Sequence, residues 1–240
     1  MKVDLVVLPS ELRPEHLAGK AAVVFDVLRA TTSMTAALTA GVREIRVFDT
    51  LDAARGAAKE FAGPRILCGE ERCLAPAGFD LGNSPGAFSG DHAGRTIFMC
   101  TTNGTRAILA ARGAAMLLIG ALVNASAVAR HLAQSGLDVT LVCAGTNGSI
   151  ALEDLIGAGA VMSALIDASK CDPVSDAARI ALRLFRGAKD DLAGALSDSA
   201  GGRNVLGVGL AADIAYAASL NRLNGVGIVK DDPLRVTISL

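Results

Sequence analysis

The sequence predicts an α/β protein: a three-layer α/β/α fold built on a mostly parallel, mixed sheet. Short apolar runs, typical of strands that are buried on both faces, alternate along the chain with longer Ala-rich segments of helical periodicity. Polar or Gly-containing turns follow the apolar runs, as expected where helices cover both faces of a sheet. No linker divides the 240 residues, so we expect one domain over residues 1–240.

The predicted strands are the short apolar runs at residues 5–8, 21–27, 44–48, 66–68, 96–99, 116–119, 139–143, 226–229 and 235–239. The predicted helices are longer, several end at Gly or Gly-Pro, and they lie at 33–40, 51–61, 107–111, 125–134, 151–169, 172–186, 190–196 and 206–220. A turn at 231–233 separates the last two strands. We expect this closing pair to form a hairpin or two strands at the edge of the sheet.

The composition excludes several classes of protein. Hydrophobic residues make up 51% of the chain and charged residues 20%, which predicts a folded domain. A net charge of −1 and only 3% aromatic residues give no basis for nucleic-acid binding. We expect no membrane span, because Asn124 and Ser126 interrupt the uncharged segment 113–129. Asp4 argues against a signal peptide and the five cysteines form no CxxC pair, so we expect a reduced, cytoplasmic protein.

The segment 100–106, Cys-Thr-Thr-Asn-Gly-Thr-Arg, is the first candidate site. It joins a predicted buried strand to a predicted helix. The first N–H groups of a helix have no partner within the helix and its dipole is positive there, so such a turn can bind an anion. Thr101, Thr102 and Thr105 add hydroxyl donors, and Gly104 allows a close approach to the backbone. The alternative is an ordinary capped helix, because these residue types are common at caps.

A second turn repeats this pattern. The segment 145–149, Gly-Thr-Asn-Gly-Ser, follows the predicted strand 139–143, and the segment 29–33 is a looser third copy. In a doubly wound sheet such turns gather at the carboxyl ends of the strands, where ligands bind. The repeat therefore predicts one anion pocket, with Gly145 and Thr146 on its second arm.

Acidic residues near these turns offer ligands for a cation. Asp26 ends a buried strand and Arg29 lies three residues further on. We interpret Asp26 as a metal ligand or general base and Arg29 as a bidentate phosphate clamp; the alternative is an ion pair between the two. Glu70 and Asp80 lie in the irregular segment 69–94 and offer the oxygen ligands that Mg²⁺ prefers, with solvated loop acids as the alternative.

Other candidates have structural explanations of equal or greater weight. Glu153 and Asp154 fall in the first turn of a predicted helix, where acids interact favourably with the dipole. Gly157 and Gly159 are interpreted as positions of close helix packing. The sequence contains no zinc-protease motif, no nucleophile elbow and no phosphate-binding P-loop.

Several of these segments together resemble the 2-phosphosulfolactate phosphatase family. The resemblance lies in Asp-Val-Leu-Arg-Ala-Thr-Thr at 26–32, Gly-Phe-Asp-Leu-Gly-Asn-Ser-Pro at 78–85 and Thr-Thr-Asn-Gly-Thr at 101–105. Leu-Glu-Asp at 152–154 and Asp-Ala-Ala at 176–178 also fit. The matching segments keep their order and extend over roughly residues 3–220.

The resemblance implies an α/β fold and Mg²⁺-dependent hydrolysis of a phosphate monoester. The family's substrate is (2R)-2-phospho-3-sulfolactate, which yields 3-sulfolactate and phosphate on the route to coenzyme M. From their chemistry we expect catalytic roles for Asp26, Arg29 and Glu70, and metal ligation by Asp26, Glu70 and Asp80. The residues expected to bind phosphate or substrate are Arg29, Asn83, Thr101, Thr102, Asn103, Gly104, Thr105, Gly145 and Thr146. A homodimer is the base-rate expectation.

Two positions depart from the family's pattern. Family members commonly have Gly-Gly-Glu-Arg where this chain has Cys-Gly-Glu-Glu at 68–71, and many have a histidine near Gly201, whereas no histidine follows His131 here. Two alternatives therefore stay open: a phosphatase for another small phosphorylated acid, and a non-catalytic anion-binding homologue. A sulfonated substrate would also need a second cationic or N–H-rich pocket, for which the turn 145–149 is a candidate.

Overall fold

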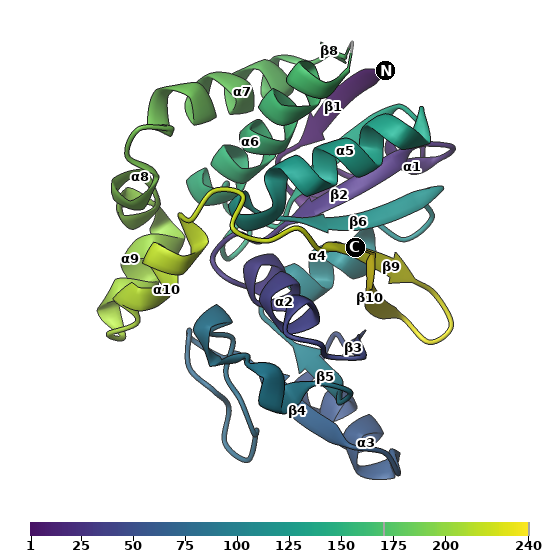
Figure 1. The fold of residues 1–240 in the computed structure, drawn as a ribbon, viewed down its shortest axis with the longest axis vertical. Helices are drawn as coiled ribbons and strands as arrows, with labels where there is room; N and C mark the ends of the chain where they lie inside the picture. Colours follow the sequence, from purple (N-terminus) through teal and green to yellow (C-terminus); the bar gives the residue numbers. More distant parts are fainter. Residues whose placement is uncertain (170, 240) are drawn as a thin grey trace.

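The structure is a computed structural model that describes residues 1–169 and 171–239. The described residues form one ten-stranded mixed sheet with helices on both faces, which confirms the predicted α/β class (Figure 1). The strands are β1 (Lys2–Val6), β2 (Ala21–Phe25), β3 (Glu44–Val47), β4 (Arg65–Gly69), β5 (Thr96–Cys100), β6 (Met116–Gly120), β7 (Val139–Cys143), β8 (Asp172–Pro173), β9 (Val226–Lys230) and β10 (Arg235–Ser239). The α-helices are α1 (Pro14–Leu17), α2 (Ala30–Thr39), α3 (Leu51–Glu60), α4 (Gly104–Ala110), α5 (Ala125–Ser135), α6 (Leu152–Ala168), α7 (Asp176–Ala188), α8 (Leu192–Asp198), α9 (Ala200–Gly207) and α10 (Ala211–Ala217).

The sheet consists of two parallel blocks joined by an antiparallel hairpin. Its strand order is β4-β5-β3-β10-β9-β6-β2-β7-β1-β8. All neighbouring strands are parallel within the small block (β4, β5, β3) and within the large block (β6, β2, β7, β1, β8). The pairings β3–β10, β10–β9 and β9–β6 are antiparallel. Because these three reversals separate the blocks, the two blocks run in opposite senses along the sheet.

The closing pair of strands is a hairpin, but it lies inside the sheet and not at its edge. Ile228 of β9 is opposite Leu118 of β6, and Val236 of β10 is opposite Ile45 of β3. The expectation of an edge position is therefore wrong. Most side chains of β9 and β10 are only partly buried. Polar and apolar residues are therefore mixed in these two strands, as they commonly are in strands at the edge of a sheet. Side-chain polarity reports burial and does not report whether both backbone edges of a strand are hydrogen-bonded.

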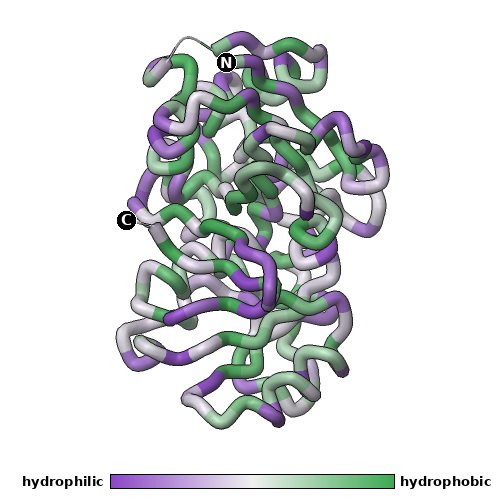
Figure 2. The backbone as a smooth tube through the Cα atoms, turned by 90° about the vertical axis from the view of Figure 1, so that its right-hand side faces the viewer, coloured by the Kyte–Doolittle hydropathy of each residue, from purple (hydrophilic) through white to green (hydrophobic). Residues whose placement is uncertain are grey.

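Alternating residues of the strands pack into two different cores, as a three-layer fold requires. On β2, Ala21, Val23 and Phe25 contact the core formed with α5, α6 and α7, whereas Ala22 and Val24 contact the core formed with α2 and α4. A smaller core joins α3 to β4 and β5. Figure 2 shows the hydrophobic residues running through the interior, with hydrophilic residues in the turns and outer segments.

Helix α2 lies at the centre of the molecule, between the two blocks (Figure 1). It packs against β3, β6, β9 and β10, and its residues from Ala30 to Leu38 are all buried. Its buried hydroxyl groups have backbone acceptors: Thr31 Oγ1 donates to Asp26 O at 2.9 Å, and Ser33 Oγ donates to Asn83 O of the irregular segment at 2.8 Å. The same core contains residues of both blocks, so the sheet curves around α2 and brings the blocks together.

The C-terminal helices differ from the prediction in two places. The predicted helix 206–220 is interrupted, because Gly209 has a φ of 79°: its first two residues end α9, which already begins at Ala200, and α10 begins only at Ala211. The predicted helix 172–186 begins only with α7, because β8 occupies its first residues beside β1. Ser175 then caps α7 by accepting the N–H of Ala178 at 3.3 Å.

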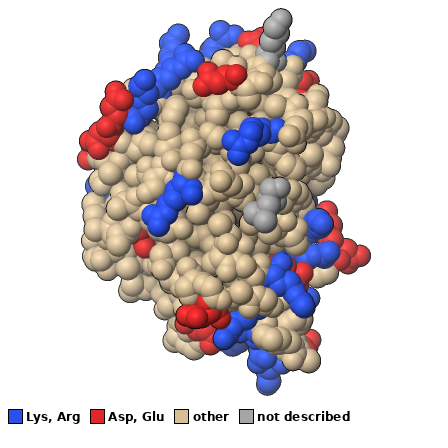
Figure 3. Space-filling view, in the orientation of Figure 1, with Lys and Arg blue, Asp and Glu red and all other residues tan. Residues whose placement is uncertain are grey.

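No helix in the described part of the chain is both long and apolar enough to span a bilayer. On the face drawn in Figure 3, basic and acidic side chains are interspersed and neither sign forms a large patch. This distribution agrees with the net charge of −1.

Gly159 tests the packing of α6 on α7. A Cβ atom at this position would lie 2.1 Å from the carbonyl oxygen of Ala181, so Gly159→Ala should lower the free energy of unfolding by about 1–3 kcal/mol. The control is Gly56→Ala on α3, where a Cβ atom meets nothing within 4 Å and helix propensity should raise stability by about 0.5–1 kcal/mol. Urea denaturation of both variants measures the difference. Equal effects would contradict the packing explanation.

Candidate functional site

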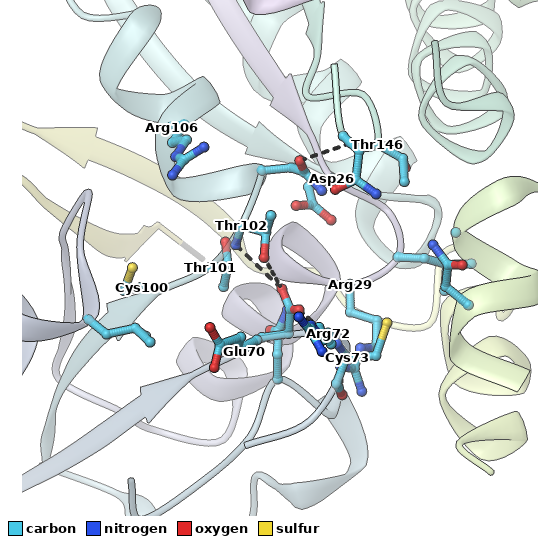
Figure 4. Close-up of a pocket in the computed structure, with 18 of the residues that line it drawn as sticks. Asp26, Arg29, Glu70, Arg72, Cys73, Cys100, Thr101, Thr102, Arg106 and Thr146 are labelled. Atoms are coloured by element: carbon cyan, nitrogen blue, oxygen red, sulfur yellow. Dashed lines mark hydrogen bonds between the residues drawn. The ribbon is translucent and has the colours of Figure 1, made fainter. Parts of the chain in front are cut away.

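One cavity, of about 780 Å³, lies at the carboxyl ends of strands from both blocks (Figure 4). The segments that follow β2, β3, β4, β5 and β7 contribute to its wall, together with α9. The predicted gathering of turns therefore occurs, although it joins strands of opposite sense. The lining residues are Asp26, Leu28, Arg29, Asp49, Thr50, Leu51, Asp52, Arg55, Glu70, Glu71, Arg72, Cys73, Asn83, Cys100, Thr101, Thr102, Asn103, Arg106, Thr146, Asn147, Gly201, Asn204 and Val208.

Asp26 lies where the two blocks meet. Asp26 directly follows β2 of the large block and is only 6% exposed to solvent. Its Oδ1 accepts the N–H of Ala30 at 3.1 Å. Gly104, which follows β5 of the small block, packs directly against it. A Cβ atom at position 104 would lie 2.6 Å from Asp26 Oδ2 and 2.5 Å from the Cβ of Ala30. Glycine is therefore required at position 104 because Asp26 and Ala30 pack against its backbone, and not because a ligand does.

Burial, together with the negative charges of Glu70 and Glu153, raises the pKa of the Asp26 carboxyl to about 6, although the N–H groups of Ala30 and Gly104 act in the opposite direction. Burial also raises the pKa of Asp154 well above its ordinary value, together with the charges of Asp26 and Glu153. The site therefore concentrates negative charge that a bound cation would stabilise.

Glu70 connects the segment after β4 to the turn after β5. Its Oε2 accepts the hydroxyl of Thr102 at 3.1 Å and the N–H of Thr102 at 3.4 Å, and its Oε1 accepts the N–H of Cys73 at 2.7 Å. Figure 4 includes dashed lines for the contacts between Glu70 and Thr102. Glu70 is thereby held in the cavity wall with its carboxylate in a fixed orientation.

The segment 101–105 combines the two interpretations of its sequence. Thr101 Oγ1 accepts the N–H of Thr105 at 3.2 Å, and Thr105 Oγ1 donates to the carbonyl of Thr101 at 2.9 Å, so these two threonines cap α4. Thr101, Thr102 and Asn103 line the cavity, whereas Thr105 is fully buried beneath it. The N–H of Thr105 is therefore used in the cap and is not available to a ligand, whereas the side chains of Thr101 and Asn103 border the cavity.

The two Thr-Asn-Gly segments adopt different backbones and touch each other. Asn103 has φ −119° and directly precedes α4. Asn147 and Gly148 have φ 52° and 76° and occupy a tight turn closed by hydrogen bonds between Thr146 and Ser149. The N–H of Asn147 donates to Asn103 Oδ1 at 3.4 Å. The repeat in sequence therefore marks one shared wall, built from a helix cap and a reverse turn.

Arg29 pairs with Asp213 of α10 and not with Asp26. Its Nη1 lies 2.6 Å from Asp213 Oδ2 and 3.2 Å from Ser84 Oγ, and its Nη2 donates to the carbonyl of Cys73. The side chains of Arg29 and Asp213 are 2% and 7% exposed. Arg29 lines the cavity, but its guanidinium is already bound to Ser84, Asp213 and the carbonyl of Cys73, so part of its binding capacity is used.

Asn83 and Asp80, both in the irregular segment, have different positions. Asn83 is buried, lines the cavity, and its Oδ1 has no hydrogen-bond partner among the described residues. Asp80 does not line the cavity: its Oδ2 accepts the N–H of Leu67 at 2.7 Å at the outer edge of β4. The structure therefore brings Asp26 and Glu70 to the cavity but leaves Asp80 outside it.

Three acids that support the site were not among the predicted site residues, although Glu153 and Asp154 were expected to interact with a helix dipole. Asp213 lies 184 positions from Arg29, and nothing in its Ala-rich helix indicates this partner. Asp154 accepts the N–H groups of Val27 at 2.9 Å and Gly145 at 3.0 Å, and so joins the ends of β2 and β7. Glu153 is 1% exposed and its Oε2 has no partner among the described residues. For Asp154 and Glu153, the sequence did contain one indication: two adjacent acids within the apolar pattern of a predicted helix.

The donor set fits a cation whose coordination is completed by substrate and water. Within residues 1–169 and 171–239, no group of three or more His, Cys, Asp or Glu side chains is arranged to hold a metal ion. Mg²⁺ commonly uses only one or two protein carboxylates, with waters and substrate phosphate as further ligands. Asp26 and Glu70 supply two carboxylates in the cavity wall, and the unpartnered Asn83 Oδ1 supplies a neutral oxygen.

The mostly parallel sheet covered by helices defines an α/β protein. The acidic and hydroxyl side chains at the carboxyl ends of its strands form a polar site for a small ligand. Within that class, the chain belongs to the 2-phosphosulpholactate phosphatase family, whose model matches residues 6–232. The family resemblance of the sequence motifs is thereby confirmed.

The chain is similar over most of its length to bacterial proteins named "Probable 2-phosphosulfolactate phosphatase". The relative from Carboxydothermus hydrogenoformans is 38% identical over 226 residues, which cover 94% of this chain and 92% of the relative. The relative from Deinococcus radiodurans is 42% identical over 214 residues, or 88% of each chain. The relative from Clostridium acetobutylicum is 35% identical, covering 90% of this chain and 92% of its own.

The raised pKa of Asp26 predicts a pH-dependent stability difference in the metal-free protein. Between about pH 4 and 6 the folded protein retains a proton that the unfolded chain has released, so the free energy of unfolding should fall as the pH rises through this interval. Asp26→Asn should remove this contribution, which is on the order of 2–3 kcal/mol. Urea denaturation in a chelator from pH 4 to 7 measures it. The exposed acid variant Asp167→Asn is the control, and parallel curves for wild type and Asp26→Asn would contradict the assignment.

Proposed function

We propose that this protein is a Mg²⁺-dependent phosphatase that hydrolyses (2R)-2-phospho-3-sulfolactate to 3-sulfolactate and phosphate, a reaction of the coenzyme M biosynthesis type. Family membership and the names of the relatives support the reaction class. The observation that carries the site assignment is Asp26, a buried carboxylate with a raised pKa that lines the cavity beside Glu70 and the hydroxyl groups of 101–102.

The charge of the cavity supports a requirement for a cation. Its lining contains five acids (Asp26, Asp49, Asp52, Glu70 and Glu71) and four arginines (Arg29, Arg55, Arg72 and Arg106). The proposed substrate carries a carboxylate, a sulfonate and a phosphate. A lining with this balance would repel such a ligand, and a divalent cation held at the carboxylates reverses the sign where the phosphate binds.

The residues of the cavity take distinct roles in this proposal. Asp26 and Glu70 hold Mg²⁺, which supplies a Lewis acid for the phosphoryl group when bound. Thr102 holds the Glu70 carboxylate through its hydroxyl and N–H. Thr101, Asn103 and the guanidinium of Arg106 face the phosphate from the β5–α4 segment and stabilise its charge as the ester bond breaks. Arg29 fixes the wall through Asp213. Asp80 has no part in this metal site.

We also propose a reducing, cytoplasmic location for the protein. All five cysteines are free thiols, and Cys68, Cys100 and Cys143 are buried. Free buried thiols are typical of proteins in reducing compartments.

A second candidate function, hydrolysis of a different small phosphorylated acid, is favoured by the surroundings of Gly201. A Cβ atom at position 201 would lie 1.9 Å from Glu153 Oε1, so the space beside α9 is filled by the Glu153 carboxylate. The family commonly has a histidine near position 201, where this chain has Gly201 with the Glu153 carboxylate behind it. The family also commonly has an arginine at position 71, where this chain has the exposed Glu71. These differences alter the charge of the wall that meets the part of the substrate remote from the metal.

Substitution of the proposed metal ligands tests the mechanism. Asp26→Asn and Glu70→Gln should each lower Mg²⁺-dependent phosphate release by at least about 100-fold, the upper range for residues that only support a metal ligand. Asp80→Asn is the matched control, because the structure places this third predicted ligand outside the cavity and its amide oxygen can still accept the Leu67 N–H. Circular dichroism checks folding. Loss of Mg²⁺ dependence in Asp80→Asn, or its retention in Asp26→Asn, would overturn the proposed ligand set.

A substrate panel separates the two candidate functions. With Mg²⁺ present, we expect kcat/KM for 2-phospho-3-sulfolactate to exceed that for phosphoglycolate, phosphoglycerate and phospholactate by more than about 10-fold, the effect of one additional charged contact. Phosphate release with each ester is the measurement. A higher value for a substrate without a sulfonate would favour the second candidate, and background rates with every ester would favour a non-catalytic anion-binding protein.

A further inference from the structure

Arg72 and Cys73 form the centre of a tight turn that lines the cavity. Two backbone hydrogen bonds between Glu71 and Leu74, of 3.0 and 3.1 Å, close this turn. Its two central residues have φ values of 52° and 67°. Two positive φ values define the type I′ geometry, in which Asn and Gly are the usual residues. An arginine followed by a cysteine is therefore an unfavourable choice for this backbone.

Residues of the site hold this turn from both sides. The N–H of Cys73 donates to Glu70 Oε1 at 2.7 Å, and the carbonyl of Cys73 accepts from Arg29 Nη2. Glu70 and Arg29 both line the cavity. The unfavourable conformation of Arg72 is thus maintained by the same residues that build the site, and backbone strain held in this way points to a functional use.

Arg72 is also one of two arginines in the cavity wall whose charge is not paired within the described residues. Arg29 is paired with Asp213 at 2.6 Å and Arg55 with Asp52 at 2.6 Å. Among the described residues, neither Arg72 nor Arg106 forms a salt bridge. Figure 4 shows Arg106 at the upper left and Arg72 nearer the middle, between Glu70 and Cys73. The two cations approach the cavity from different segments.

The turn 145–149, the other candidate for a second anion, has few donors left. The N–H of Gly145 is bound by Asp154 at 3.0 Å, and that of Asn147 by Asn103 at 3.4 Å. The N–H groups of Thr146 and Ser149 are used within the turn itself. A second anionic group of a ligand therefore has a better partner in a guanidinium than in this turn.

We propose that Arg72 binds an acid group of the substrate other than the phosphate, and so makes the cavity selective for phosphate esters that carry a second anion such as a sulfonate. This inference rests on the proposed function, in which Thr101, Asn103 and Arg106 face the phosphate. A guanidinium on a rigid turn suits the task, because its planar donors bind an oxyanion in a fixed direction.

The variant Arg72→Asn tests this assignment without disturbing the turn, because asparagine accepts a positive φ. With 2-phospho-3-sulfolactate, kcat/KM should fall by about 10- to 100-fold, mostly through KM, as a charge-assisted contact is lost. With p-nitrophenyl phosphate, which has no second acid group, kcat/KM should stay within about 3-fold, and Arg72→Lys should retain part of the selectivity. Arg130→Gln, on the exposed side of α5, is the control. Equal losses with both esters, or no loss with either, would overturn the proposal.

Binding of the dephosphorylated product separates this proposal from the proposed function. Calorimetric titration with 3-sulfolactate should show binding to the wild type that weakens by about 10-fold or more in Arg72→Asn, whether or not the protein turns over. Arg72-dependent binding without phosphatase activity would support the subsite and refute the proposed reaction. Active enzyme whose affinity for 3-sulfolactate does not depend on Arg72 would refute the subsite alone.

Discussion

The contact between Asp26 and Gly104 is the constraint on which the site depends. Asp26 directly follows β2 of the large block, Gly104 follows β5 of the small block, and a side chain at position 104 would not fit between them. Because the two blocks run in opposite senses, their carboxyl ends meet only if the sheet curves around α2. The buried carboxylate lies at this junction, so the same contact joins the blocks and sets the chemistry of the cavity.

Some charged side chains at this junction have partners among the described residues that neutralise or satisfy them, and others do not. The first group has a structural role and the second a functional one. Asp213 neutralises Arg29, and two backbone N–H groups satisfy Asp154, so these residues hold the wall together. Burial and the charge of Glu70 raise the pKa of Asp26, and within the described part of the chain only hydrogen bonds oppose this rise. Buried acids without a cationic partner are costly unless they bind something, and this cost is the physical basis for the cation in the proposed function.

The fold class, most strands and most segments of the cavity wall follow from local patterns in the sequence, because buried strands and Gly-containing turns leave strong signals. The place of β9 and β10 does not, since their half-buried side chains look like those of edge strands. Asp80 and Asp213 show the same limit at the site. Asp80 belongs to a motif yet serves the edge of β4, whereas Asp213 belongs to no motif and secures Arg29. Pairing between distant residues depends on how the chain folds back, which local pattern does not encode.

The central position of the hairpin has a consequence for biosynthesis. β9 and β10 are made after every other strand of the sheet, and they supply the backbone partners for both β6 and β3. A growing chain can therefore form each parallel block on the ribosome but must wait for the hairpin to join them through the sheet. Until then, β3 and β6 each have an unpaired edge that is open to pairing with another chain. The last-made strands of this sheet thus protect the nascent protein from aggregation as well as completing its fold.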